Sequence, residues 1–157
     1  DGGWNPLVEQ LIADGDAGRP IEVPDELVEA IAATLKRWDW QDRPTWICPV
    51  PSRRRSALID GIVDELGSLG KLPVYRALLG TDEAGFQAEQ ANSAHQVGNV
   101  WTRYRVDVAA VPDGRIPPGP VLLVDDEVDS RWTTTVAAWQ LGTAGSGAVL
   151  PFALRAR

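Results

Sequence analysis

The sequence is poor in residues that build covalent or metal-based frameworks. It has one cysteine, Cys48, and one histidine, His95, among 157 residues. A disulfide within the chain is therefore excluded, and so is a zinc cluster, because both need more such side chains. So little cysteine suits a reducing compartment. We expect a cytoplasmic location, no structural metal, and Cys48 buried as a small apolar residue.

The sequence also lacks a long apolar run, a methionine and an excess of positive charge. No stretch approaches the ~20 apolar residues of a membrane helix, so we expect no membrane contact. Because methionine is absent, we expect a piece of a longer protein. Acidic residues outnumber basic ones by 22 to 15, for a net charge of -7. This balance argues against a surface built mainly to bind nucleic acid, because phosphate binding needs local positive charge.

What is present indicates a globular domain, since 44% of residues are hydrophobic and 24% are charged. Helical periodicity predicts helices over 4–13, 24–38, 58–69 and 133–141. Apolar runs predict strands over 45–50, 72–79, 100–106, 121–124 and 148–154. Strands that alternate with helices predict an α/β fold with a parallel sheet. We expect a helical lead-in over 1–40, packed on a three-layer domain over 41–157, with Trp38, Trp46 and Trp139 in the core.

The clearest motif begins at Val121. Four apolar residues are followed by Asp125 and Asp126, a polar loop, and a helix from Thr133. In open α/β sheets, ligands bind beyond the carboxyl ends of the strands. The backbone N–H groups that open a helix attract phosphate, and carboxylates accept hydrogen bonds from ribose hydroxyls or hold a metal through water. The motif therefore predicts a sugar-phosphate site.

This segment resembles the phosphoribosyl-pyrophosphate signature of the type I phosphoribosyltransferases. The resemblance rests on the apolar strand, the acid pair and the final threonine of residues 121–133. It implies the fold of that family, with Asp125 and Asp126 on the ribose hydroxyls and Mg²⁺ arriving with the donor. It also implies that a loop surrounds the 5′-phosphate, formed by Asp129, Ser130, Arg131, Trp132 and Thr133.

The loop departs from the family pattern at two positions. Asp129 stands where threonine is usual, and Arg131 stands where glycine is usual. Glycine permits a close backbone approach to phosphate, whereas arginine hinders it. We therefore expect ligand binding or regulation rather than catalysis. We also expect the Trp132 ring to plug the site or pack, rather than to stack on a base. An active Mg²⁺-dependent transferase, which moves phosphoribose to a nitrogen nucleophile, is the first alternative.

A second resemblance covers the middle of the chain. Residues 50–55 and 87–99 resemble the ComF branch of these transferases. The resemblance implies that the loop after the first strand faces pyrophosphate or another anion through Ser52, Arg53, Arg54 and Arg55. Three cations at a helix N-terminus oppose the helix dipole at a cost of about 0.3–1 kcal/mol each, which favours an anionic ligand there. A DNA-binding module is therefore the second alternative.

Several motifs together resemble the C-terminal region of bacterial RecQ-type DNA helicases. They occupy residues 3–4, 50–55, 90–93, 99–101 and 124–133. In those proteins a phosphoribosyltransferase-like domain follows the motor. The resemblance implies an accessory domain in DNA repair or recombination, with the motor of the same chain as its partner and DNA reached through the parent protein. ATP hydrolysis lies outside this chain, because Gly70-Lys71 continues into Leu72 without a phosphate-loop motif.

Overall fold

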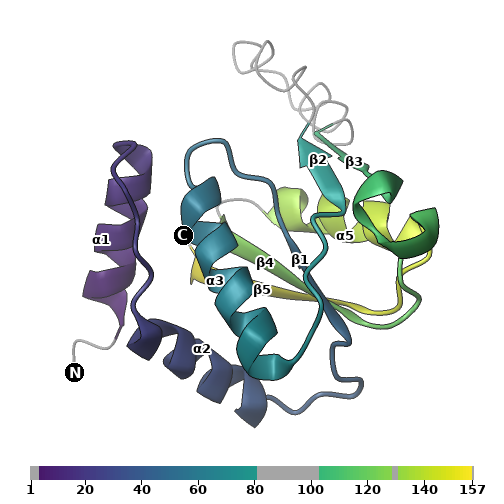
Figure 1. Cartoon of the computed structure of the whole chain (residues 1–157), viewed down its shortest axis with the longest axis horizontal. Coiled ribbons are helices and arrows are strands. Elements are labelled where there is room, and N and C mark those ends of the chain that lie inside the picture. The colour runs from purple at the N-terminus through teal and green to yellow at the C-terminus, as the bar shows by residue number, and fades with distance from the viewer. Residues whose placement is uncertain (1–3, 81–102, 129–130, 157) are drawn as a thin grey trace.

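The computed structural model describes residues 4–80, 103–128 and 131–156 (Figure 1). The helices are α1 (Asn5–Asp16), α2 (Asp25–Arg37), α3 (Ser56–Gly70) and α5 (Arg131–Thr143), with short 3-10 helices η2 (Val108–Ala110) and η3 (Pro112–Gly114). The strands are β1 (Trp46–Pro49), β2 (Leu78–Gly80), β3 (Tyr104–Val106), β4 (Val121–Val128) and β5 (Val149–Ala156). None of the helices in these ranges is long and apolar enough to cross a membrane.

The central sheet is parallel, with the strand order β1-β4-β5. Val121 of β4 lies opposite Trp46 of β1 on one side and Val149 of β5 on the other. Val74 adds a parallel bridge to Ile47 at the outer edge of β1. Helices separate these strands along the chain, so the predicted α/β fold with a parallel sheet is confirmed.

The segment 72–79 is not the single strand that the sequence predicted. Its first half bridges β1 at Val74, and its end enters β2, which pairs antiparallel with β3. Between the two, the carbonyl of Ala77 accepts a hydrogen bond from the N–H of Asp107 at 2.8 Å. Hydrophobic alternation shows that a segment is extended, but the partner of each residue is decided by the rest of the fold.

Helices cover both faces of the sheet (Figure 1). Successive side chains of a strand point to opposite faces, and those of β4 join two separate cores. Leu122 and Val124 pack with the buried residues of α1, α2 and α3. Val121 and Leu123 pack with those of α5 and with Tyr104 of β3. The two N-terminal helices therefore share a core with α3 and the sheet.

Only one of the three tryptophans expected in the core is buried. Trp46 is 1% exposed, whereas Trp38 is 39% and Trp139 50% exposed. The expectation is confirmed for Trp46 and wrong for the other two. On α5 the reason is the helical period, because the helix buries Ala137 and Leu141 on one side and turns Trp139 to the opposite side. Cys48 is fully buried as expected, and burial raises the pKa of its thiol to about 12.

Gly67 lies where α3 passes close to the segment that follows it. A Cβ at this position would lie 2.7 Å from Cγ2 of Val74 and 3.0 Å from the carbonyl oxygen of Leu72. We expect Gly67→Ala to lower the free energy of unfolding by about 1–3 kcal/mol in urea denaturation, because packed interiors resist added volume. Gly142→Ala is the matched control. Nothing lies within 4 Å of its Cβ, so this change should stabilise helix α5 slightly. Equal effects of the two changes would contradict the close approach.

Candidate functional site

The predicted acid pair lies within β4 rather than beyond its end. The sequence predicted that the strand ends at Val124, but the ladder with β5 continues to Val128. Asp125 pairs with Ala153 of β5 in this extension. Asp125 and Asp126 are each 6% exposed. Because this part of β4 is paired with β5, both carboxyl groups are buried near the carboxyl end of the central strand.

Burial and proximity change the ionisation of this pair. The pKa of Asp125 is raised to about 7, first by burial and then by a side-chain hydrogen bond and the charge of Asp126. Oδ1 of Asp125 accepts a hydrogen bond from the backbone N–H of Asp126 at 2.8 Å. Two adjacent carboxyl groups with little access to water are not easily ionised together, because their charges repel and are poorly solvated. Near neutral pH Asp125 therefore changes between its neutral and its charged form.

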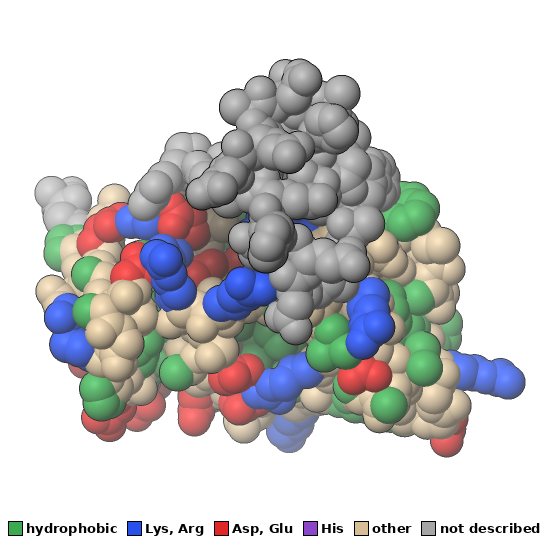
Figure 2. Space-filling view, turned by 90° about the horizontal axis from the view of Figure 1, so that it is seen from above, with side chains coloured by type: hydrophobic (Ala, Val, Ile, Leu, Met, Phe, Trp, Pro, Cys, Tyr) green, Lys and Arg blue, Asp and Glu red, His purple; other side chains and the backbone are tan. Residues whose placement is uncertain are grey.

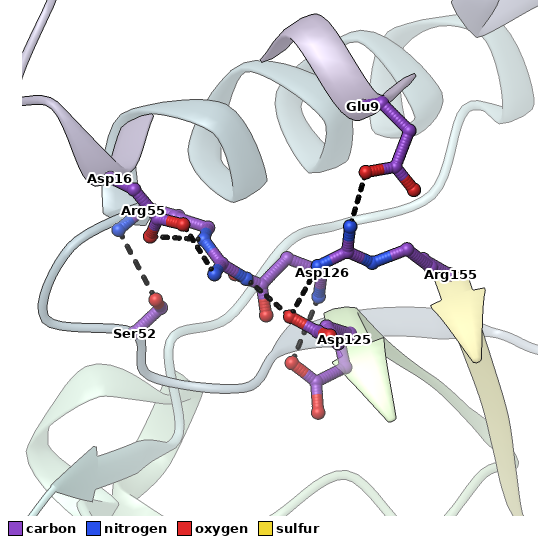
Figure 3. A network of polar contacts seen from close by, with 8 residues as sticks. Glu9, Asp16, Ser52, Arg55, Asp125, Asp126 and Arg155 are labelled. Carbon is purple, nitrogen blue, oxygen red and sulfur yellow. Dashed lines mark hydrogen bonds and ion pairs between the residues drawn. The ribbon is translucent and has the colours of Figure 1, made fainter. Parts of the chain in front are cut away.

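Arg55 joins three carboxylates (Figure 3). Its Nη1 donates to Oδ2 of Asp126 and to Oε2 of Glu127, both at 3.0 Å. Its Nε and Nη2 donate to the two carboxylate oxygens of Asp16 at 2.8 and 2.9 Å. The hydrogen bonds with Asp16 are the largest cause that raises the pKa of Arg55 and lowers the pKa of Asp16. The sequence predicted Arg55 in an anion loop, and the anions that it binds in the structure are the protein's own.

Arg155 of β5 forms the other half of the same network. It is the cross-strand neighbour of Glu127, and its Nη2 lies 2.8 Å from Oε2 of that residue. Its Nη1 donates to Glu9 of α1. Because Asp16 also belongs to α1, two ion pairs fasten this helix to the carboxyl end of the sheet. The acid–arginine cluster is defined here as Glu9, Asp16, Arg55, Asp125, Asp126, Glu127 and Arg155.

The rest of the predicted arginine loop lies nearer the surface. The Oγ of Ser52 accepts a hydrogen bond from the backbone N–H of Arg55 at 3.2 Å, where α3 begins. Arg53 and Arg54 are exposed, and the charge of Arg54 contributes to the lowered pKa of Asp16. Figure 2 shows acidic and basic side chains interspersed on one face of the molecule. The loop thus turns one arginine inward and leaves two at the surface.

The predicted phosphate loop leads into α5, which begins at Arg131. Trp132 is 52% exposed, so its ring is not packed in the core. The Oγ1 of Thr133 accepts a hydrogen bond from Nη1 of Arg103 at 3.5 Å. The remaining parts of the predicted loop lie outside the described residues: Asp129, Ser130 and the side chain of Arg131.

Arg103 is a cation near the start of α5 that the sequence analysis missed. Its guanidinium carbon lies 5.9 Å from the centroid of the Tyr104 ring. The pKa of Tyr104 is raised to about 12, first by burial, and the charges of Asp125 and Asp126 also raise it. Arg103 therefore contacts both Thr133 at the start of α5 and the ring of Tyr104, which lies close to Asp125 and Asp126. No local motif marks it, because 30 positions separate it from Thr133.

The motifs in the middle of the chain cannot be placed on this site. Residues 87–99, 90–93 and 99–101, which carried the second and third resemblances, lie outside the described residues, as does His95. Gly3 is outside them as well, whereas its neighbour Trp4 is 45% exposed. The described part of the site therefore rests on residues 50–55 and 121–133 and on their contacts.

Magnesium was expected only together with phosphoribosyl pyrophosphate. Within 4–80, 103–128 and 131–156, no three histidine, cysteine, aspartate or glutamate side chains form a group that could hold a metal ion. Oxygens of Asp126 and Glu127 accept hydrogen bonds from Arg55, and Glu127 also pairs with Arg155. Oδ2 of Asp126 and Oε2 of Glu127 are therefore engaged by arginine side chains.

The acid–arginine cluster sets five carboxyl groups against two guanidinium groups. An excess of acceptors favours hydroxyl donors and repels a phosphate. An anion would instead lie at the N-terminus of α5, beside Arg103 and Thr133. The arrangement therefore suits a ligand with hydroxyls at one end and a phosphate at the other.

No protein-family model matches this sequence, and no curated protein is significantly similar to it.

Proposed function

We propose that this chain is an accessory, phosphoribosyltransferase-like domain of a RecQ-type DNA helicase, and that it binds a phosphorylated sugar without transferring it. The observation that carries the proposal is the buried pair Asp125–Asp126 at the carboxyl end of the central parallel strand, just before α5. Open α/β sheets bind their ligands at this end. The carboxyl groups accept hydrogen bonds from ribose hydroxyls, and the start of α5 holds the phosphate.

The contacts of Arg55 support binding rather than transfer. A transferase must stabilise the pyrophosphate that leaves, and preorganised cations do this. The sequence placed Arg53, Arg54 and Arg55 there. Arg55 is already paired with three carboxylates of the protein, and the other two arginines lie at the surface. Arginine in place of glycine at position 131 also hinders a close backbone approach to phosphate. Both features favour a site that holds a ligand and lacks the means to activate it.

The partners of the domain follow from the resemblance to the helicase C-terminal region. Under the proposal, the domain contacts the motor of the same protein and reaches DNA through it in the cytoplasm. Binding of a sugar phosphate to the domain would then regulate the motor. The proposed partners are supported by the sequence motifs at residues 50–55 and 124–133. Mg²⁺ enters the proposal only as a companion of a diphosphate ligand.

The proposal is tested by calorimetric titration with ribose 5-phosphate and with phosphoribosyl pyrophosphate, with and without Mg²⁺. We expect saturable binding that strengthens from pH 6 to pH 8 with a midpoint near 7, because the protonated Asp125 loses an acceptor. Asp125→Asn should remove this pH dependence and weaken binding at pH 8 by about 10-fold or more. Asp64→Asn is the matched control, because it removes the same charge from an exposed carboxylate on α3.

Other results would select among the alternatives. Absence of binding to both sugar phosphates contradicts the proposal. Release of pyrophosphate that depends on an added nitrogen base establishes the transferase instead. Binding of DNA by the isolated chain, with an affinity that falls steeply as salt rises, establishes a DNA-binding module. Exposed Arg53 and Arg54 are the residues whose replacement should then reduce that salt dependence.

A further inference from the structure

A hollow of about 490 Å³ lies between the loop that follows α2 and the start of β5. Sites for small molecules ordinarily have volumes of about 300–1,000 Å³. The aromatic hollow is defined here by the residues that line it, which are Trp38, Asp39, Trp40, Gln41, Asp42, Ala148, Leu150 and Pro151. It lies at the amino end of the parallel sheet, because β5 begins at Val149. It therefore shares no residue with the acid–arginine cluster, which lies at the carboxyl end.

The two tryptophans of the aromatic hollow are held in place by contacts with the rest of the fold. The chain leaves α2 at Trp38, whose extended backbone takes the side chain out of the helical period. Its ring is 39% exposed and contacts Phe152 of β5, with 6.1 Å between the ring centroids. Nε1 of Trp40 donates a hydrogen bond to the carbonyl oxygen of Leu35 at 2.7 Å. Both rings are therefore in position without a ligand.

The two rings lie close enough to contact one ligand together. The centroids of Trp38 and Trp40 are 5.0 Å apart, and the ring planes are tilted by 43°. A cation is attracted to the face of a tryptophan when it lies within about 6 Å of the ring centroid. One group in the hollow that both residues line can meet this condition for both rings. Two such contacts favour a cation over a neutral ligand of the same shape.

The charge that lines the aromatic hollow is negative. Of its lining residues only Asp39 and Asp42 are charged, and both are exposed. Among the residues that the structure describes, no hydrogen bond or ion pair engages either carboxylate. Both follow the carboxyl end of α2, where the helix dipole is negative. Lys36 and Arg37 in the last turn of α2 do not line the hollow. The hollow therefore complements a positive charge.

We propose that the aromatic hollow binds a methylated ammonium group. A hard metal ion needs several oxygen ligands in one place, and the described ranges hold no group of three histidine, cysteine, aspartate or glutamate side chains that could provide them. A plain ammonium group is strongly hydrated, and aromatic rings do not replace the water that it loses. Methyl groups weaken this hydration and pack on the rings of Trp38 and Trp40, while the carboxylates balance the charge.

The test is an NMR titration of the whole isotope-labelled chain, in which the indole N–H signals of the tryptophans show where a ligand binds. The probes are choline, a short peptide that contains trimethyllysine, and the neutral analogue of choline with carbon in place of the charged nitrogen. We expect saturable shifts of the Trp38 and Trp40 signals, with at least about 10-fold weaker binding of the neutral analogue. The tighter of the two cations shows whether the group belongs to a small molecule or to a protein side chain.

Trp38→Leu keeps an apolar side chain but removes one aromatic face, so it should weaken binding of the tighter cation by at least about 5-fold. Trp4→Leu is the matched control. Its ring is 45% exposed and lies outside the aromatic hollow, so binding should not change. Circular dichroism should show that both variants are folded, because both replaced side chains are exposed.

A second pair of variants tests the charge without changing the rings. Asp39→Asn combined with Asp42→Asn should weaken binding by about 3-fold or more, and added salt should reduce this difference. Glu26→Gln combined with Glu29→Gln removes the same charge from exposed positions of α2 and should leave binding unchanged.

Several results would overturn the proposal. Absence of saturable shifts with both methylated cations is one, and equal binding of the neutral analogue is another. Tighter binding of guanidinium than of either methylated cation would assign the hollow to a different ligand. An effect of Trp4→Leu as large as that of Trp38→Leu would place the binding elsewhere. None of these results depends on the proposed sugar-phosphate site, so the two proposals stand or fall separately.

Discussion

Arg55→Ala is expected to lower the free energy of unfolding by about 3–5 kcal/mol, because removal of one partner from a buried ion network leaves the others uncompensated. The side chain of Arg55 is 14% exposed, and those of Asp126 and Glu127 are 9% exposed. Loss of the guanidinium would leave these two carboxylates beside each other with little water to solvate them, although Arg155 would still pair with Glu127. It would also release Asp16 and so loosen the attachment of α1.

Urea denaturation at pH 7 measures this loss. Arg55→Lys keeps a charge but not the planar fork that reaches three carboxylates, so its loss should be intermediate. Arg76→Ala is the control, because Arg76 also pairs with two carboxylates, Asp60 and Asp64, at an exposed position. Exposed pairs contribute about 0–1 kcal/mol. If Arg55→Ala costs no more than Arg76→Ala, the acid–arginine cluster does not support the fold.

Asp125→Asn is expected to stabilise the protein by about 4 kcal/mol at pH 8 and to change little at pH 4. The folded-state pKa of Asp125 is about 7, against an ordinary value of 3.8. Between these values the folded state holds a proton that the unfolded state has lost, so stability falls as pH rises from about 4 to 7. Asparagine has no proton to lose, and its Oδ1 can still accept the hydrogen bond from the backbone N–H of residue 126.

Unfolding free energies of both proteins, measured from pH 4 to pH 8, give the difference attributable to Asp125. Asp16 has a lowered pKa, so its contribution is lost in acid, but it is common to both proteins and cancels. Asp64→Asn serves as the control, because it removes the same charge from an exposed position. A constant difference between Asp125→Asn and the unmodified chain across this range would rule out a raised pKa as its cause.

These two predictions bear on function in opposite ways. Arg55 is expected to stabilise the fold, and its charge is used inside the protein. Asp125 destabilises the fold at neutral pH, where it is driven to ionise beside Asp126 in a buried place. Residues that cost stability in this way cluster at functional sites. We therefore expect Asp125 to favour ligand binding while it lowers the stability of the fold.

Local patterns predicted much of the fold. The apolar runs at Thr45 and Val121 each predicted a buried strand, because a strand buried on both faces has no polar alternation. The helix over 25–37 was marked by its period and by Asp25 and Glu26 at the positive end of its dipole. The end of β4 was not predicted, because acids after an apolar run have the pattern of a turn. Pairing with β5 keeps them in the strand.

The sequence by itself determined the alternation of helices and strands, the parallel sheet, and that Asp125 and Asp126 directly follow the apolar run of a buried strand. These follow from residues close together in the chain. Only the tertiary structure decided which charges meet. Arg55 meets Asp16 across 39 positions, and Arg155 meets Glu9 across 146, because packing of α1 against the sheet brings them together. A periodic pattern carries no information about such contacts, since side chains far apart in the chain become neighbours only when the elements that bear them are packed.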